Sequence, residues 1–161
     1  MTPADLLHTA IIPALSRLKM DSTDARRFML AIALQESGLK ARRQRSADGS
    51  ESGPAASFWQ FEKGGGCKGV LSHRAVAPAM RQVCEDFNVE PNALALWEAI
   101  RHQDIVAACA ARLLIYTLPT PIPTTSADGW AQYLEAWRPG KPHPATWAGH
   151  WATAERAVGV P

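Results

Sequence analysis

The sequence lacks any run of about 18 consecutive apolar residues, so we expect no segment that spans a membrane. An excess of charge is also missing, because 17 Lys and Arg face 15 Asp and Glu. The resulting net charge of +2 is too small to hold a protein on nucleic acid by charge alone. The composition also excludes collagen, a coiled coil and a disulfide-rich scaffold.

Cysteine is scarce and odd in number, with Cys67, Cys84 and Cys109 at unpaired spacings. This pattern fits a reducing compartment and predicts three small buried thiols. A zinc site needs ligands closer in sequence than Cys67 and His73, or Cys84 and His102. We therefore expect no metal and no cofactor.

The first residues lack the features of a secretory signal. No basic region precedes residue 8, Asp5 stands where such a signal is apolar, and the apolar stretch over residues 9–15 contains Pro13. We expect cytoplasmic synthesis without a signal peptide.

With 47% hydrophobic and 20% charged residues in 161, the chain has the composition of an ordinary folded protein, and we expect one domain over residues 1–161. Periodicity, N-cap residues and terminators predict helices at 3–19 with a kink at Pro13, 25–35, 72–87, 92–99, 102–117, 127–137 and 145–157. Residues 40–57 are polar and irregular, 58–61 suit a short strand or turn, and Gly64, Gly65 and Gly66 predict a loop. The expected fold class is mainly α.

The predicted helix 25–35 is apolar on nearly every side, as in a buried helix, and it leads into Glu36 before a stop at Gly38. Apolar neighbours and the negative end of the helix dipole both disfavour a carboxylate there. Both effects raise the pKa of the carboxyl, as a general acid working near neutral pH requires. A frayed, solvated helix end explains Glu36 equally well.

Two segments give Glu36 a context: residues 31–39 (AIALQESGL) and residues 53–61 (GPAASFWQF). A third, residues 136–140 (AWRPG), follows late in the chain. Together they resemble the lysozyme-like superfamily, in particular lytic transglycosylases and phage peptidoglycan hydrolases. In that family a buried helix ends in Glu-Ser, a turn carries Gly-x-x-Gln, and an Ala-Tyr-Asn-x-Gly motif comes late. Here Ser57 replaces the glycine of the turn, and Trp137 and Arg138 replace Tyr and Asn.

The resemblance implies a single-domain lysozyme-like fold whose buried central helix ends in the catalytic acid/base, Glu36. It implies that Ser37 and Gln60 position the sugar or the acid. It also implies that Phe58, Tyr116 and Trp137 line the cleft. A lytic transglycosylase needs no second carboxylate, because the same Glu later acts as base on the sugar's own 6-hydroxyl. A hydrolase with two carboxylates would draw on Asp48, Glu51 or Glu62, each of which a solvated loop also explains.

Aromatic rings offer an apolar face to sugar C–H groups. The candidates are Trp59, Trp137, Trp147, Trp151, Tyr116 and Tyr133. Core burial is the alternative for each of them, and Trp97 has the helical spacing of a core residue.

The remaining patterns favour no other chemistry. The basic run at residues 40–45 (KARRQR) suits a solvated loop, and residues 64–69 (GGGCKG) lack the spacing of a phosphate-binding loop. We therefore expect a muramidase or lytic transglycosylase that cleaves the β-1,4 bond of peptidoglycan strands, made as a phage endolysin or carried in a virion. The alternatives are a chitinase-like hydrolase of the same superfamily and a non-catalytic helical virion or nucleic-acid-binding protein.

Overall fold

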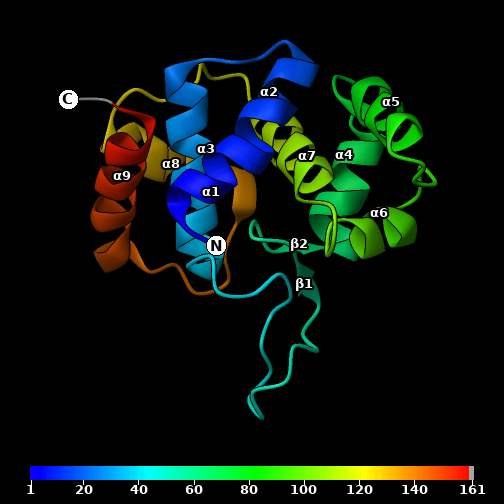
Figure 1. Ribbon diagram of the computed structural model, residues 1–161, viewed down its shortest axis with the longest axis horizontal. Coiled ribbons are helices and arrows are strands. Elements are labelled where there is room, and N and C mark those ends of the chain that lie inside the picture. The colour runs from blue at the N-terminus through cyan, green and yellow to red at the C-terminus, as the bar shows by residue number, and fades with distance from the viewer. Residues whose placement is uncertain (160–161) are drawn as a thin grey trace.

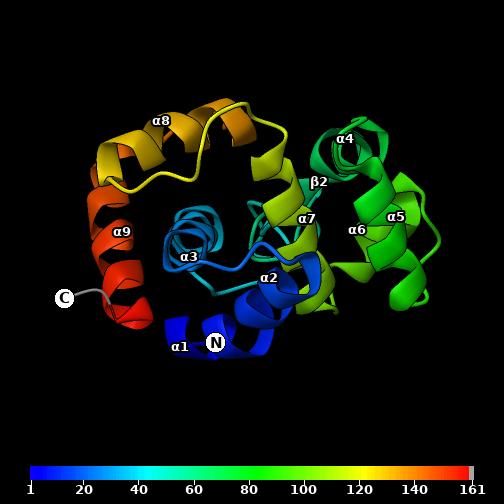
Figure 2. The ribbon, with the colours of Figure 1, turned by 90° about the horizontal axis from the view of Figure 1, so that it is seen from above.

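Helix α3 (Thr23–Ser37) runs through the middle of the molecule, and other helices surround it (Figure 2). The computed structural model describes residues 1–159. Helix α9 (Pro144–Val158) packs along α3, while α8 (Ser126–Trp137) and α7 (Asp104–Tyr116) complete the ring (Figures 1 and 2). Nine residues of α3 are buried, from Ala25 to Leu34 with the exception of Arg26. The expectation of a mainly α protein with a buried helix leading to Glu36 is confirmed at this level.

The first helix contains a π-helical turn that ends two residues before Pro13. Helix α1 (Pro3–Leu6), η1 (Leu7–Ile11) and α2 (Ile12–Leu18) follow without a break. In η1 the Ile12 amide donates to the carbonyl of Leu7, five residues back. Because Pro13 has no N–H and its ring crowds the preceding turn, a widened turn accommodates it. The helix predicted at 3–19 is confirmed.

Beyond α7 lies a group of short helices, seen in green in Figure 1. These are η2 (Lys63–Cys67), α4 (Lys68–Ser72), α5 (Ala77–Asp86) and α6 (Ala93–Ala99). The loop predicted at Gly64, Gly65 and Gly66 is wrong, because these glycines form the π-helical η2. Gly66 lies against Phe61, whose ring would be 2.9 Å from a Cβ at this position. The helix predicted at 72–87 is also divided, with an irregular link before α5.

Two short strands form a hairpin beside the end of α3. Strand β1 (Ala55–Ala56) pairs antiparallel with β2 (Phe61–Glu62), with Ala56 opposite Phe61. The four-residue turn between them carries Trp59, which is fully buried and donates from Nε1 to the Met29 carbonyl of α3 at 2.9 Å. This bond fixes the hairpin to the central helix.

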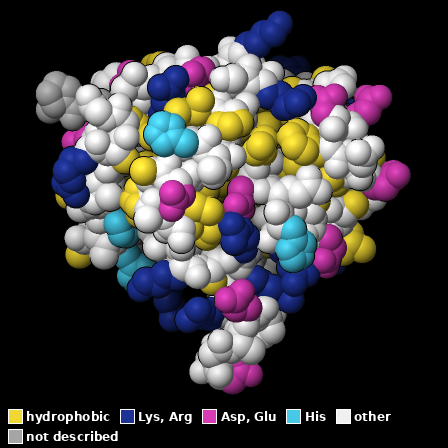
Figure 3. Space-filling view, in the orientation of Figure 1, with side chains coloured by type: hydrophobic (Ala, Val, Ile, Leu, Met, Phe, Trp, Pro, Cys, Tyr) yellow, Lys and Arg dark blue, Asp and Glu magenta, His cyan; other side chains and the backbone are white. Residues whose placement is uncertain are grey.

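The polar residues 40–54 project from the body as an extended loop (Figure 1). Lys and Arg side chains gather where it leaves the body (Figure 3). Arg42 binds Asp104 through two hydrogen bonds of 2.8 and 2.7 Å, and Arg43 donates to the Gly53 carbonyl at 3.1 Å. Arg42 therefore attaches the projection to α7, and Arg43 joins the two ends of the projection to each other.

One hydrophobic core draws on residues from Leu6 to Ala154. Cys67, Cys84 and Cys109 are buried and unpaired, as predicted. Burial raises the pKa of the Cys67 and Cys109 thiols to about 12, so both are protonated near neutral pH. Within residues 1–159 no helix has the length and apolar character needed to cross a membrane.

Candidate active site

Glu36 lies in the last turn of α3. Residues at both ends of the helix fix where it begins and ends, and so fix this position. Ser22 caps the first turn by accepting the Ala25 amide at 3.1 Å. Gly38 ends the helix in the left-handed conformation, with φ of 57°. Glu36 is therefore held at the point where the buried helix reaches the surface, and its side chain is partly buried.

Tyr133 of α8 is the hydrogen-bond partner of Glu36. Its hydroxyl donates to Glu36 Oε1 at 2.5 Å, and only 2% of the tyrosine is exposed. Burial raises the pKa of the Glu36 carboxyl, and the bond from Tyr133 opposes part of that rise. Burial also raises the pKa of the Tyr133 hydroxyl, so that it remains a donor. The pair presents a carboxyl that favours its protonated form more than an exposed one does.

Glu36 opens into a cleft of about 760 Å³. The cleft is lined by the end of α3, the hairpin, η2, the end of α7, and the end of α8 with the residues that follow it. Its lining residues are Gln35, Glu36, Gln44, Ala55, Gln60, Phe61, Glu62, Gly65, Gly66, Leu114, Thr117, Leu118, Tyr133, Glu135, Ala136, Trp137, Arg138, Pro139, Gly140, Lys141 and His143. This volume is in the range of small-molecule sites, about 300–1,000 Å³.

The hairpin turn brings Gln60 to the cleft through strained backbone. Ser57 and Gln60, the first and last residues of the turn, have φ of 66° and 53°, which L residues seldom adopt. The Ser57 hydroxyl accepts the Trp59 amide at 3.2 Å, and Gln60 Nε2 donates to the Ser57 carbonyl at 2.8 Å. The turn is thus supported by its own polar side chains.

Trp137 lines the same cleft from the last position of α8. Its Nε1 donates to the Trp59 carbonyl at 2.8 Å, which joins α8 to the hairpin. Its ring lies 5.8 Å from that of Phe61 and stacks on Tyr133 at 6.3 Å. Trp137 is therefore both a wall of the cleft and a support for the tyrosine that binds Glu36.

A polar network flanks Glu36 on the side of α9. Gln35 donates from Nε2 to the His143 carbonyl at 3.1 Å, and its Oε1 accepts from Thr146 Oγ1 at 3.1 Å. His150 Nδ1 lies 2.9 Å from the same oxygen. Since an amide oxygen only accepts, His150 carries its proton on Nδ1 in this contact. Burial lowers the pKa of His150, which favours the neutral ring.

Three of the residues that the sequence assigns to the site lie elsewhere. Ser37 accepts the Leu39 amide and donates to the Ala33 carbonyl, so its hydroxyl caps the helix end. Phe58 is 2% exposed and packs in the core beneath the Arg42 guanidinium. Tyr116 is 51% exposed and lines a different cavity. Glu36, Gln60 and Trp137 are the predicted residues that the fold brings together.

The carboxylates differ in how the protein surrounds them. Glu62 and Glu135 line the cleft but are exposed. Asp48 accepts from Ser50 in the projecting loop, and Glu51 lies 3.9 Å from Arg45. Among the carboxylates that line the cleft, Glu36 is the one that is partly buried.

Most of the other residues predicted to stack on sugar are buried in the core. Trp147 and Trp151 are 3% exposed and pack on Phe28 of α3 at 6.5 and 6.4 Å between ring centroids. Trp97 is only partly buried, and its Nε1 donates to the Pro54 carbonyl at 2.7 Å. The prediction that Trp97 is a core residue is confirmed in part, because Trp97 packs against the core while its Nε1 binds the residue directly before β1.

The sequence offers little sign of the contact between Glu36 and Tyr133, since 97 residues separate the two. Over the part of the chain that is described, no three His, Cys, Asp or Glu side chains cluster as a metal site would require. Comparison of the chain with protein-family models, curated proteins and solved structures finds no match.

Proposed function

We propose that this protein is a peptidoglycan-cleaving enzyme of the lysozyme-like fold, a muramidase or lytic transglycosylase, with Glu36 as general acid and base. The observation that carries the proposal is a carboxyl at the end of a buried helix, lining a cleft of about 760 Å³ and held by the Tyr133 hydroxyl at 2.5 Å. Burial raises the pKa of this carboxyl, as an acid that acts near neutral pH requires.

The placement of the other motif residues supports the same proposal. Ser57 occupies the position at which the resembled motif has glycine, and its φ of 66° is one that glycine tolerates best. Gln60 and Trp137, from the second and third motifs, line the cleft with Glu36. Three segments that are distant in sequence thus contribute to a single cleft.

In the reaction that we propose, Glu36 acts first as an acid and then as a base. Glu36 gives its proton to the glycosidic oxygen as the bond between that oxygen and C1 breaks, and the carboxylate then takes a proton from the nucleophile that attacks C1. If the nucleophile is water, the product has a reducing end. If it is the 6-hydroxyl of the same sugar, the product is a 1,6-anhydro ring. Tyr133 orients the carboxyl, and Trp137 offers a ring face to the sugar.

Mass spectrometry of the fragments released from purified cell walls tests the proposal. We expect the wild-type protein to release muropeptides, with anhydro or reducing ends reporting the nucleophile, and Glu36→Gln to release almost none. Cleavage of chitooligosaccharides without wall fragments would favour the chitinase-like alternative. A salt-dependent shift of DNA in a gel, with no fragments from either substrate, would overturn the proposal in favour of a binding protein.

A further inference from the structure

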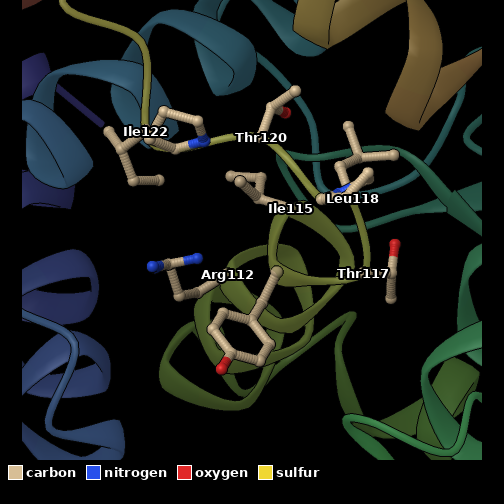
Figure 4. A pocket seen from close by; sticks show the side chains of 9 residues that line it. Arg112, Ile115, Thr117, Leu118, Thr120 and Ile122 are labelled. Carbon is tan, nitrogen blue, oxygen red and sulfur yellow. The ribbon is translucent and has the colours of Figure 1, made fainter.

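A second cavity, of about 400 Å³, lies beside the C-terminal end of α7. Its walls are the last residues of α7 and the proline-rich segment at residues 117–122 (Figure 4). In Figure 4 Arg112 extends toward the side where Ile122 lies, whereas Thr117 and Leu118 are on the opposite side. The two cavities are neighbours, because Thr117 and Leu118 also line the cleft of Glu36.

Arg112 is a buried cation that lacks a hydrogen-bond acceptor among the described residues. It is 7% exposed, and its buried Nε has no hydrogen-bond partner within residues 1–159. No carboxylate in that part of the chain forms an ion pair with it, and its guanidinium faces the Tyr116 ring at 5.8 Å. Buried charges in proteins are nearly always paired, because an unpaired one loses its hydration without compensation. Burial lowers the pKa of Arg112, as this loss requires.

The rest of the lining indicates what would pair with Arg112. Arg112 is the one charged residue of the lining, and most of the other side chains are aliphatic or proline. Gln132 Nε2 donates to the Thr120 hydroxyl at 2.7 Å and to the Pro121 carbonyl at 2.9 Å. The Thr120 oxygen therefore accepts from Gln132, and this bond fixes a residue of the cavity wall. The lining thus offers one planar cation, the hydroxyl-bearing side chains of Tyr116, Thr117 and Thr120, and aliphatic and proline walls.

We infer that this cavity binds a carboxylate carried by a short apolar group, and that the Arg112 guanidinium donates hydrogen bonds to both carboxylate oxygens. A planar fork of N–H donors matches a carboxylate in this way. A single cation neutralises a single negative charge, and the apolar walls accept the attached group. Two sources share this chemistry, a free aliphatic acid and the C-terminal carboxylate of a small peptide. The inference does not depend on the reaction proposed for Glu36.

Calorimetric titration with sodium pentanoate and with N-acetyl-alanyl-alanine tests the inference. The probe with the lower dissociation constant shows whether the ligand is a free aliphatic acid or a peptide C-terminus. We expect saturable binding of at least one probe, no binding of the neutral pentanamide, and binding weakened about tenfold or more in Arg112→Met. Arg156→Met, the same change at an exposed arginine of α9, should bind as the wild type does.

A second measurement keeps the test decisive if Arg112→Met does not fold. In the wild-type protein, the methyl NMR signals of Ile115 and Ile122 should shift on titration with the same probe, because both residues line the cavity. Absence of saturable binding by either probe would overturn the inference. So would binding that persists in Arg112→Met, or inorganic phosphate binding as tightly as the carboxylates.

Discussion

Helices α3 and α7 are the two helices with the most buried residues. They differ in whether the protein supplies a partner for their buried charged side chains. On α3, Arg27 pairs with Asp24 and donates to the Thr124 carbonyl at 3.2 Å, and Glu36 accepts from Tyr133. On α7, Arg112 has no such partner within the described residues. The charged groups on α3 therefore have partners within the protein, although Arg27 Nε, like Arg112 Nε, is buried without a hydrogen-bond partner in residues 1–159. In our inference, Arg112 on α7 gains a charged partner only when a carboxylate ligand enters its cavity.

The partner of Glu36 depends on how α8 sits against α9. Gly129 of α8 lies under Trp151 of α9, and Tyr133, one turn later, stacks on Trp147 with 5.4 Å between ring centroids. The carboxyl of α3 is thus oriented by aromatic contacts between two other helices. Helix α8 also contacts the wall of the Arg112 cavity, through the bonds from Gln132 to Thr120 and Pro121, so we expect changes at this interface to affect the α3 site more than the α7 site.

The largest expected effect is the loss of wall cleavage in Glu36→Gln. The amide keeps the shape of the side chain and cannot deliver a proton, so we expect activity to fall by about 10²–10⁴-fold. The rate of muropeptide release from purified walls measures the change. Glu90→Gln, at an exposed position that does not line the cleft, is the matched control. Activity within about tenfold of wild type, in a variant with an unchanged melting temperature, would remove Glu36 from the mechanism.

Gly129→Ala should destabilise the protein and disturb the α3 site more than the α7 site. A Cβ at this position would lie 2.4 Å from the Trp151 ring, and overpacking of this kind costs about 1–3 kcal/mol in free energy of unfolding. Gly149→Ala on α9 is the control, because its Cβ would meet nothing within 4 Å and alanine favours a helix. Denaturant unfolding measures both variants. Equal stabilities would show that α8 and α9 adjust without strain.

The helix that carries Glu36 could be predicted from local signals. Ser22 at its start, apolar residues on nearly every side and Gly38 at its end each act within a few residues. The contact with Tyr133 could not, since it depends on how α8 packs on α9. The burial of Phe58 is equally hidden in the sequence, because Phe58, Trp59 and Phe61 are close together in one motif and look alike until the turn orients them. The π-helix at Gly64–Gly66 was missed because glycine usually signals a loop.

The pH dependence of the protein's stability should reveal the raised pKa of Glu36. Because burial lifts the pKa in the folded state above its ordinary value of 4.5, the protonated carboxyl stabilises the fold at low pH. That contribution is lost as the pH rises from the unfolded value through the folded one. We therefore expect Glu36→Gln, which cannot ionise, to gain in melting temperature relative to the wild type as the pH rises through this window. A difference that is constant with pH would contradict the shift.

Tyr133→Phe should move the pH dependence of activity while changing stability less than the glycine variant. The hydroxyl lowers the pKa of Glu36 by donating to its carboxylate, so its loss lets burial raise that pKa further. Since the acid must be protonated, the alkaline limb of the pH profile of kcat/KM should then lie at higher pH. The phenylalanine ring keeps the stacking on Trp147 and Trp137, and the lost hydrogen bond costs about 0.5–1.5 kcal/mol.

Tyr116→Phe is the matched control, because Tyr116 is the other tyrosine of the chain and lies on α7, outside the cleft. The alkaline limb of its pH profile of kcat/KM should coincide with that of the wild type. In Tyr133→Phe the carboxyl of α3 becomes as unpaired as the guanidinium of α7. If the limb nevertheless stays in place or moves to lower pH, the Tyr133 hydroxyl does not control the proton of Glu36. The difference between the two helices would then concern packing alone.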